Sequence, residues 1–180
     1  MHSGNIFSIS ANWSQIGDLG LCQQIVDKKD NPNKIIGVIP YLAPEVLLRK
    51  PYTKESDIYS FGMIMWEHTT GKKPFHDREH NHLLISDILN GERPQITDDT
   101  PEFYADLMKR CWDHNPENRP TAKEIYDCLR KYYLNITKES NEINDLVIQL
   151  VESIHLVDDL YRMIRDRVYN SLHPTDTCLI

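Results

Sequence analysis

Apolar residues recur at helical spacing through the middle of the chain. Between Lys54 and Thr70 they lie nearly all round the predicted helix, which indicates a helix buried inside a domain and ended by Gly71. A second helix is predicted within the segment 80–91, where leucines and isoleucines share one face before Gly91. Two such helices in succession indicate an α-rich body.

Two further helices are predicted beyond residue 91. Thr100 followed by Pro101 is typical of a helix start, with threonine as the N-cap and proline in the first turn. The apolar stripe that follows consists of Phe103, Leu107, Met108, Cys111 and Trp112. Thr121 and Glu124 have the spacing of a capping box. The helix after it has an apolar face made of Ile125, Cys128, Leu129 and Tyr132.

The two ends of the chain carry different patterns. Strand signal is limited to Asn5–Ile9 and Trp13–Ile16 near the N-terminus, and the charged, Asn-containing stretch 22–37 is expected to be a surface loop. Toward the C-terminus, apolar residues alternate at spacings of four and three with charges between them. They are Ile143, Val147, Leu150, Ile154, Val157, Tyr161, Ile164 and Val168. A linker over 134–141 and an amphipathic helix over 142–172 are therefore expected; its stripe would pack in a coiled coil with another chain or against its own body.

Size and charge exclude several function classes. A chain of 180 residues with 40% hydrophobic content allows one ordinary core and a short appendage. Its 27 acidic residues against 20 basic ones, a net charge of -7, argue against a nucleic-acid partner. Without a signal-like N-terminus or a run of membrane-spanning length, we expect no membrane partner and a cytoplasmic location. The four widely spaced cysteines indicate reduced thiols rather than a zinc site.

Five short motifs occur in a fixed order along the helical body. They are Ala43-Pro44-Glu45, Ser56-Asp57-Ile58-Tyr59-Ser60-Phe61-Gly62, Trp66-Glu67, Cys111-Trp112 and Arg119-Pro120. Each is weak alone, but the ordered set resembles the protein kinase family, and most of all its tyrosine-kinase-like branch. The likeness covers about residues 1–133 and implies a mainly α fold, the C-terminal lobe of a kinase domain with minor β structure near the N-terminus. It also implies ATP and Mg²⁺ as cofactors and a protein as substrate.

The same resemblance implies a metal site near the N-terminus. Asp18-Leu19-Gly20 lies where the family has D-F-G, and Asn5 lies where the family's catalytic loop ends. Asn5 and Asp18 are therefore implied Mg²⁺ ligands, with Gly20 beside the nucleotide, and their hard oxygen atoms suit phosphate-bound magnesium. Without the downstream motifs, Asp and Asn next to glycine would be interpreted as turn residues.

Three other residues have structural roles by resemblance. Glu45 is expected to pair with Arg119 in a buried salt bridge at the end of the activation segment, since a guanidinium binds a carboxylate through two parallel hydrogen bonds. Asp57 is expected to accept hydrogen bonds from the catalytic-loop backbone. The segment 21–40 contains no Ser, Thr or Tyr, so Tyr41 is the first hydroxyl available for regulatory phosphorylation.

The sequence also departs from the family pattern. The aspartate base of the family is expected just before Met1, so no catalytic residue is assigned within the chain. No glycine-rich phosphate loop or V-A-I-K strand motif occurs, and a chain without these parts is expected to be inactive alone. His2, Gly4 and Val38 fit neither the serine/threonine nor the tyrosine pattern fully. Two functions stay open: phosphoryl transfer to protein Ser/Thr or Tyr hydroxyls by the full-length domain, or a pseudokinase or truncated lobe that acts as a docking or oligomerisation module.

Overall fold

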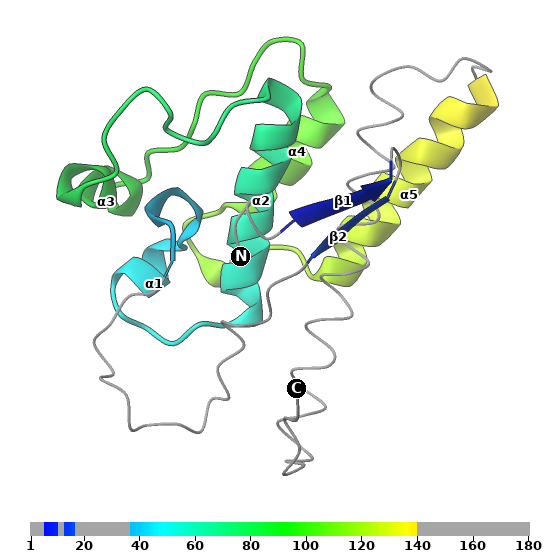
Figure 1. The fold of residues 1–180 in the computed structure, drawn as a ribbon. Coiled ribbons are helices and arrows are strands. Elements are labelled where there is room, and N and C mark those ends of the chain that lie inside the picture. Colours follow the sequence, from blue (N-terminus) through cyan, green and yellow to red (C-terminus); the bar gives the residue numbers. More distant parts are fainter. Residues whose placement is uncertain (1–5, 11–12, 17–36, 140–180) are drawn as a thin grey trace.

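The computed structural model describes residues 6–10, 13–16 and 37–139 (Figure 1). The elements in chain order are β1 (Ile6–Ser10), β2 (Trp13–Ile16), the 3₁₀ turn η3 (Ile39–Tyr41), α1 (Pro44–Leu47), α2 (Lys54–Thr70), α3 (His82–Leu89), α4 (Glu102–Cys111), the 3₁₀ turn η4 (Pro116–Asn118) and α5 (Ala122–Glu139). The prediction of a mainly α fold with minor β structure near the N-terminus is confirmed.

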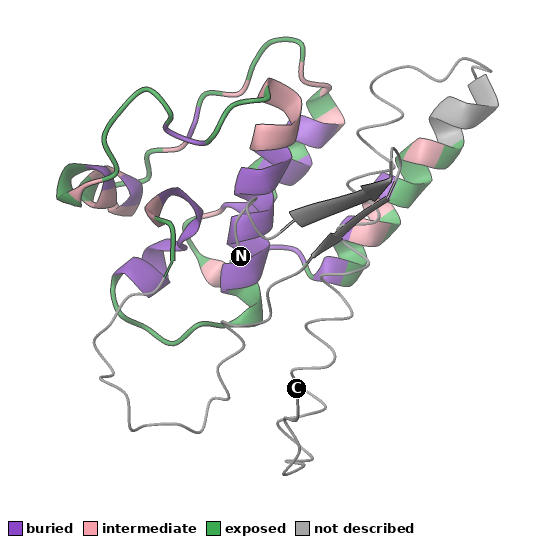
Figure 2. Cartoon of the chain, in the orientation of Figure 1, coloured by how far each residue is buried: buried purple, intermediate pink, exposed green. Residues whose placement is uncertain are grey.

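Helix α2 lies at the centre of the helical body, and its limits are those predicted from the sequence. It begins with a capping box in which the backbone N–H groups of Thr53 and Ser56 each donate to the other residue's hydroxyl. It ends at Gly71, which has a left-handed backbone with φ of 65°. Every residue from Ser56 to Trp66 is buried, as Figure 2 shows for the middle of the helix. A helix that is apolar on all sides is covered on all sides.

The neighbouring helices cover α2 with their apolar faces. Helix α4 packs against it, and Gly62 of α2 lies so close to Cys111 and Trp112 that a side chain at this position would touch them. The indole nitrogen of Trp66 donates to the carbonyl oxygen of Gln95 at 2.8 Å. The rest of the core is completed by fully buried side chains of the other helices, namely Leu84, Ile88, Leu107, Met108, Ile125 and Leu129.

The starts of α4 and α5 compare differently with the predictions. The capping box of α5 is confirmed: the Glu124 carboxylate accepts from the Thr121 backbone at 2.7 Å, and the Thr121 hydroxyl accepts from the Glu124 backbone at 3.2 Å. The hydrogen bonds that the Thr121 backbone and hydroxyl donate to the carboxylate lower the pKa of Glu124 below its ordinary value. The N-cap of α4, in contrast, is Pro101 and not Thr100. The Thr100 hydroxyl lies 3.0 Å from the Thr97 hydroxyl instead, so a local side-chain contact replaces the cap.

The two strands form an antiparallel hairpin close to the predicted positions. Ile6 pairs with Ile16, and the register shifts between Ser8 and Ser10. At the other end of the chain, α5 continues to Glu139 and so includes much of the range 134–141 expected as a linker. The predicted tail helix over 142–172 lies outside the described residues. None of the described helices is long and apolar enough to cross a membrane.

The contact between α2 and α4 predicts a cost for adding one methyl group. A Cβ atom at position 62 would lie 3.0 Å from the Cys111 Cβ and 3.2 Å from the Trp112 backbone nitrogen. We expect Gly62→Ala to lower the free energy of unfolding by about 1 kcal/mol, because overpacking outweighs the better helix propensity of alanine. Chemical denaturation measures this change. Lys54→Ala, at an exposed position of the same helix, is the control, and a stabilised Gly62→Ala variant would contradict the prediction.

Candidate functional site

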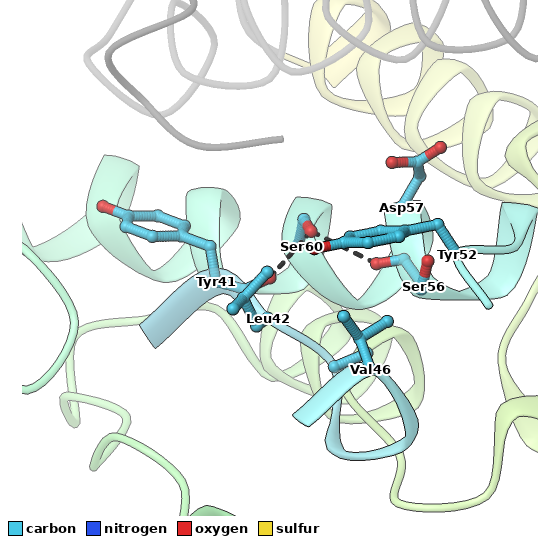
Figure 3. Close-up of a pocket in the computed structure, with 8 residues that line it drawn as sticks. Tyr41, Leu42, Val46, Tyr52, Ser56, Asp57 and Ser60 are labelled. Atoms are coloured by element: carbon cyan, nitrogen blue, oxygen red, sulfur yellow. Dashed lines mark hydrogen bonds between the residues drawn. The ribbon is translucent and has the colours of Figure 1, made fainter. Parts of the chain in front are cut away.

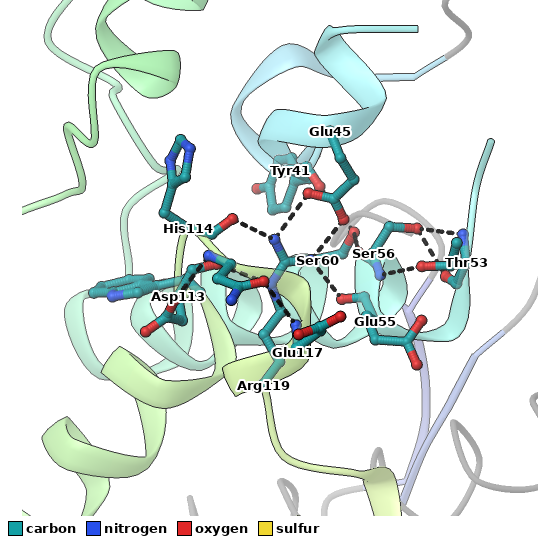
Figure 4. A network of polar contacts seen from close by, with 12 residues as sticks. Tyr41, Glu45, Thr53, Glu55, Ser56, Ser60, Asp113, His114, Glu117 and Arg119 are labelled. Atoms are coloured by element: carbon teal, nitrogen blue, oxygen red, sulfur yellow. Dashed lines mark hydrogen bonds and ion pairs between the residues drawn. The ribbon is translucent and has the colours of Figure 1, made fainter. Parts of the chain in front are cut away.

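A buried ion pair joins two segments that are far apart in the sequence. The Arg119 guanidinium donates from Nη1 to Glu45 Oε1 at 2.7 Å and from Nη2 to Glu45 Oε2 at 2.8 Å (Figure 4). The Arg119 side chain is fully buried, and the Glu45 side chain is 9% exposed. This two-point contact is the strongest geometry available to arginine and carboxylate. The structure thus brings together the two residues that the kinase resemblance paired.

The remaining N–H groups of Arg119 also have acceptors. Nε donates to the Asp113 carbonyl at 2.9 Å, Nη1 to the Glu55 carbonyl at 2.9 Å, and Nη2 to the His114 carbonyl at 3.4 Å. A guanidinium has five N–H donors, and all five are used here. We call these five residues the Arg119 cluster. It joins α1, the start of α2 and the loop after α4 at one point. Of its members, only Glu45 and Arg119 were predicted from the sequence to be in contact.

An aromatic ring lies against this buried cation. The Tyr59 ring centre is 5.2 Å from the Arg119 guanidinium carbon and 5.1 Å from that of Arg93. Among the described residues no group pairs with the Tyr59 hydroxyl, and burial raises its pKa to about 12. Burial also lowers the pKa of Arg93, which donates to the Trp112 carbonyl at 3.0 Å. No role was predicted from the sequence for Tyr59 or Arg93. The one available signal was the aromatic residue Tyr59 within the 56–62 motif.

The segment just before Glu45 is held against α2 by polar contacts. The Tyr41 hydroxyl donates to Glu67 Oε2 at 2.6 Å, and the Ser60 hydroxyl donates to the Tyr41 carbonyl at 2.8 Å. The Tyr41 side chain is only 3% exposed. The first hydroxyl expected as a phosphorylation acceptor is therefore buried and hydrogen-bonded in this conformation, a fact that the spacing of Ser, Thr and Tyr could not reveal.

A small pocket lies between this segment and the first turns of α2 (Figure 3). Its lining residues are Tyr41, Leu42, Ala43, Val46, Tyr52, Ser56, Asp57 and Ser60. Polar groups from α2 face apolar groups from η3 and α1 across it. Asp57 is only 5% exposed and interacts with other groups of the protein. Its accessible volume of about 10 Å³ is close to that of one water molecule, so the pocket is a gap in the packing and too small for a ligand or a side chain.

The three predicted cofactor residues, Asn5, Asp18 and Gly20, lie outside the described residues. The described hairpin nevertheless constrains where the chain passes. Since Ile6 pairs with Ile16, the chain enters β1 and leaves β2 at the same end of the hairpin. Within the described ranges, no group of three or more His, Cys, Asp and Glu side chains is placed to hold a metal ion.

Comparison with known proteins decides which family this arrangement represents. The sequence profile of the family described as "Protein tyrosine and serine/threonine kinase" matches residues 1–129. The chain belongs to the protein kinase family. Its described helices are therefore part of a kinase C-terminal lobe, and the Arg119 cluster lies inside that lobe.

Similar kinases come from distant organisms. A dual specificity protein kinase of Dictyostelium discoideum is 36% identical over 112 residues, which covers 62% of this chain and 15% of the relative. A putative serine/threonine-protein kinase/receptor of Acanthamoeba polyphaga mimivirus is 40% identical over 117 residues, 64% of this chain and 7% of the relative. A serine/threonine/tyrosine-protein kinase of Arabidopsis thaliana is 37% identical over 97 residues, 54% of this chain and 25% of the relative. The kinase chain thus spans a quarter or less of the length of these relatives.

The buried ion pair predicts that lysine cannot replace arginine at position 119. Lysine keeps the charge but has three donors without the planar fork, so Glu45 and several carbonyls would lose partners. We expect Arg119→Lys to lower the free energy of unfolding by about 2 to 3 kcal/mol, measured by urea denaturation. Lys123→Ala removes an exposed pair with Asp127 and should cost less than about 1 kcal/mol. Equal losses for the two variants would show that the burial of the cluster has no energetic consequence.

The buried phenol predicts a loss of stability at alkaline pH. The pKa of Tyr59 is about 12 in the folded kinase lobe against 10.0 ordinarily, so the folded state holds this proton more tightly. The contribution of this proton to the free energy of unfolding is fully present below pH 10.0 and is lost as the pH rises to about 12. The total loss is about 3 kcal/mol.

Tyr59→Phe should remove this alkaline loss and leave stability at neutral pH unchanged or raised, because the removed hydroxyl has no partner among the described residues. Urea denaturation from pH 8 to 12 measures both effects. Tyr132→Phe, at an exposed tyrosine, is the control and should keep the alkaline loss. If Tyr59→Phe keeps it as well, another group is responsible.

Proposed function

We propose that this chain is the helical lobe of a protein kinase domain that transfers the γ-phosphoryl group of ATP to a hydroxyl group of a protein. The family membership supports phosphoryl transfer in general. The relatives carry names that include serine/threonine, dual specificity and serine/threonine/tyrosine kinases, so the hydroxyl class is left as Ser/Thr or Tyr.

The register of the β1–β2 hairpin carries the proposed metal site. Asn5 is the residue before β1, and Asp18 is two residues past the end of β2. The pairing of Ile6 with Ile16, the first residue of β1 and the last of β2, supports this proposal. An amide oxygen and a carboxylate are hard donors that suit Mg²⁺. In this proposal Asn5 and Asp18 hold the metal, and Gly20 lies beside the nucleotide.

The bound Mg²⁺–ATP would supply the transferred group and neutralise its charge. The chain's own residues position the reaction. In this proposal the Arg119 cluster fixes the end of the activation segment through Glu45, and Asp57, buried at the start of α2, accepts hydrogen bonds from the catalytic-loop backbone. The general base is not assigned to any residue of this chain, so activity is proposed for a longer domain that supplies the catalytic aspartate as well as a small lobe.

The second candidate function is a docking module without catalysis. It is supported by the closed framework of the lobe, because the contacts of the Arg119 cluster and of the α2 core are made between residues of the chain itself. A lobe of this kind could present its helices to a protein partner even if no phosphoryl group is transferred.

The metal-ligand proposal predicts a specific effect of one carboxylate. In a longer protein in which a kinase small lobe precedes these residues, Asp18→Asn should lower the rate of phosphoryl transfer to a generic protein substrate by a factor of at least about 100, because a metal ligand is lost. Mg²⁺-dependent ATP binding should weaken as well. Transfer of labelled phosphate and calorimetric titration of ATP with and without Mg²⁺ measure these effects.

Asp30→Asn is the matched control, since Asp30 is another carboxylate of the segment between the hairpin and Gly37 and has no assigned role. It should leave both quantities unchanged. Equal effects of the two substitutions would contradict the assignment of Asp18. If the longer protein neither binds ATP nor transfers phosphate, the docking-module function replaces the catalytic one.

A further inference from the structure

The apolar face of helix α5 extends beyond the part that the helical body covers. Ile125 and Leu129 are fully buried, Cys128 is half-buried, and Tyr132 is 37% exposed. Spacings of three and four residues place these side chains on one face of the helix. Figure 2 shows the same change along α5, from buried residues at its start to exposed ones further on. The body therefore covers the first turns of the stripe and leaves Tyr132 partly accessible.

Aromatic side chains mark the place where this cover ends. Phe103 of α4 is half-buried, stacks on Tyr132, and meets Tyr104 edge to face at a centroid distance of 6.1 Å. The turn of α5 that carries Tyr132 also carries the exposed side chains of Arg130 and Lys131. We call Phe103, Cys128 and Tyr132 the α5 patch. It has an apolar centre, and two basic side chains lie on the same part of the helix.

The sequence just beyond α5 has the complementary character. Its apolar stripe begins at Ile143, four residues after Glu139, where α5 ends. Residues 139–159 include six acidic residues and no Lys or Arg, opposite in charge to Arg130 and Lys131. A connection of this length is typical of two antiparallel helices that pack side by side.

We propose that the C-terminal tail, residues 142–172, forms a helix that packs antiparallel to α5 and covers the α5 patch. A helix over 143–168 would be about 39 Å long and α5 is about 27 Å long, so the tail can cover α5 over its full length. The short connection gives the tail an effective concentration on the order of millimolar. A second copy of the chain at micromolar concentration therefore competes poorly for the same patch.

Amide hydrogen exchange of the full 180-residue chain tests this packing. Ile154→Lys places a charge on the apolar stripe of the tail, whereas Ser153→Lys places the same charge at the adjacent position outside the stripe. Amides of residues 132–139 should exchange about tenfold faster in the Ile154→Lys variant than in the unsubstituted chain and should be unchanged in Ser153→Lys. Amides in the middle of α2 should be equal in all three proteins, which shows that the body is folded.

A reciprocal variant and a mass measurement complete the test. Tyr132→Lys, on the body side, should speed the exchange of amides in residues 143–168, and light scattering at micromolar concentration should give a monomer mass. Equal exchange in the Ile154→Lys and Ser153→Lys variants would overturn the proposal. Protection that disappears on dilution together with a dimer would overturn it too, because a second copy would then be the occupant.

Discussion

The buried guanidinium of Arg119 is the constraint around which the rest of the lobe is arranged. Placing a charged group in the interior costs several kcal/mol unless its charge and its donors are matched. Glu45 matches the charge, while the carbonyls of Glu55, Asp113 and His114 use the donors that Glu45 leaves. Since a buried pair adds little net stability over an apolar contact, the main consequence is positional. Segments separated by 74 positions must meet at one point with hydrogen-bond precision.

Helix α2 connects the Arg119 cluster to the other parts of the lobe. Its first turn offers the Glu55 carbonyl to Arg119, its middle touches α4 at Gly62, and its last buried residue, Trp66, holds the chain at Gln95. Close packing on every side prevents rotation of the helix about its axis, because each turn meets a different neighbour. The polar groups at its start, Asp57 among them, are thereby fixed relative to the pocket beside η3 and α1.

Local signals explain which parts of this structure were predictable. Lys54–Thr70 was found to the residue, since the run of apolar residues marks the helix and Gly71 lies directly after its end. The predicted N-cap of α4 was wrong because the Thr100 hydroxyl interacts with Thr97 in the preceding loop. A helical pattern of apolar residues contains no information about such a contact. The Tyr41 hydroxyl is bound by Glu67, which is 26 positions away. The spacing of apolar residues within one helix cannot predict a contact between such distant positions. The pairing of Glu45 with Arg119 came from family resemblance, and no property of the two residues alone would have supplied it.

The arrangement also separates rigid parts of the lobe from its accessible edges. The Arg119 cluster and the α2 core are closed, with their donors and apolar faces used inside the body. Among the described residues, Tyr52 is exposed at the rim of the pocket beside α2, and Tyr132 and Leu134 are exposed on the later turns of α5. A kinase lobe needs both: a closed framework that keeps charged groups in place, and edges where a substrate or a further segment can pack without disturbing it. The ion pair lies next to both of these regions, since Glu45 precedes Val46 at the pocket and Arg119 lies three residues before the start of α5.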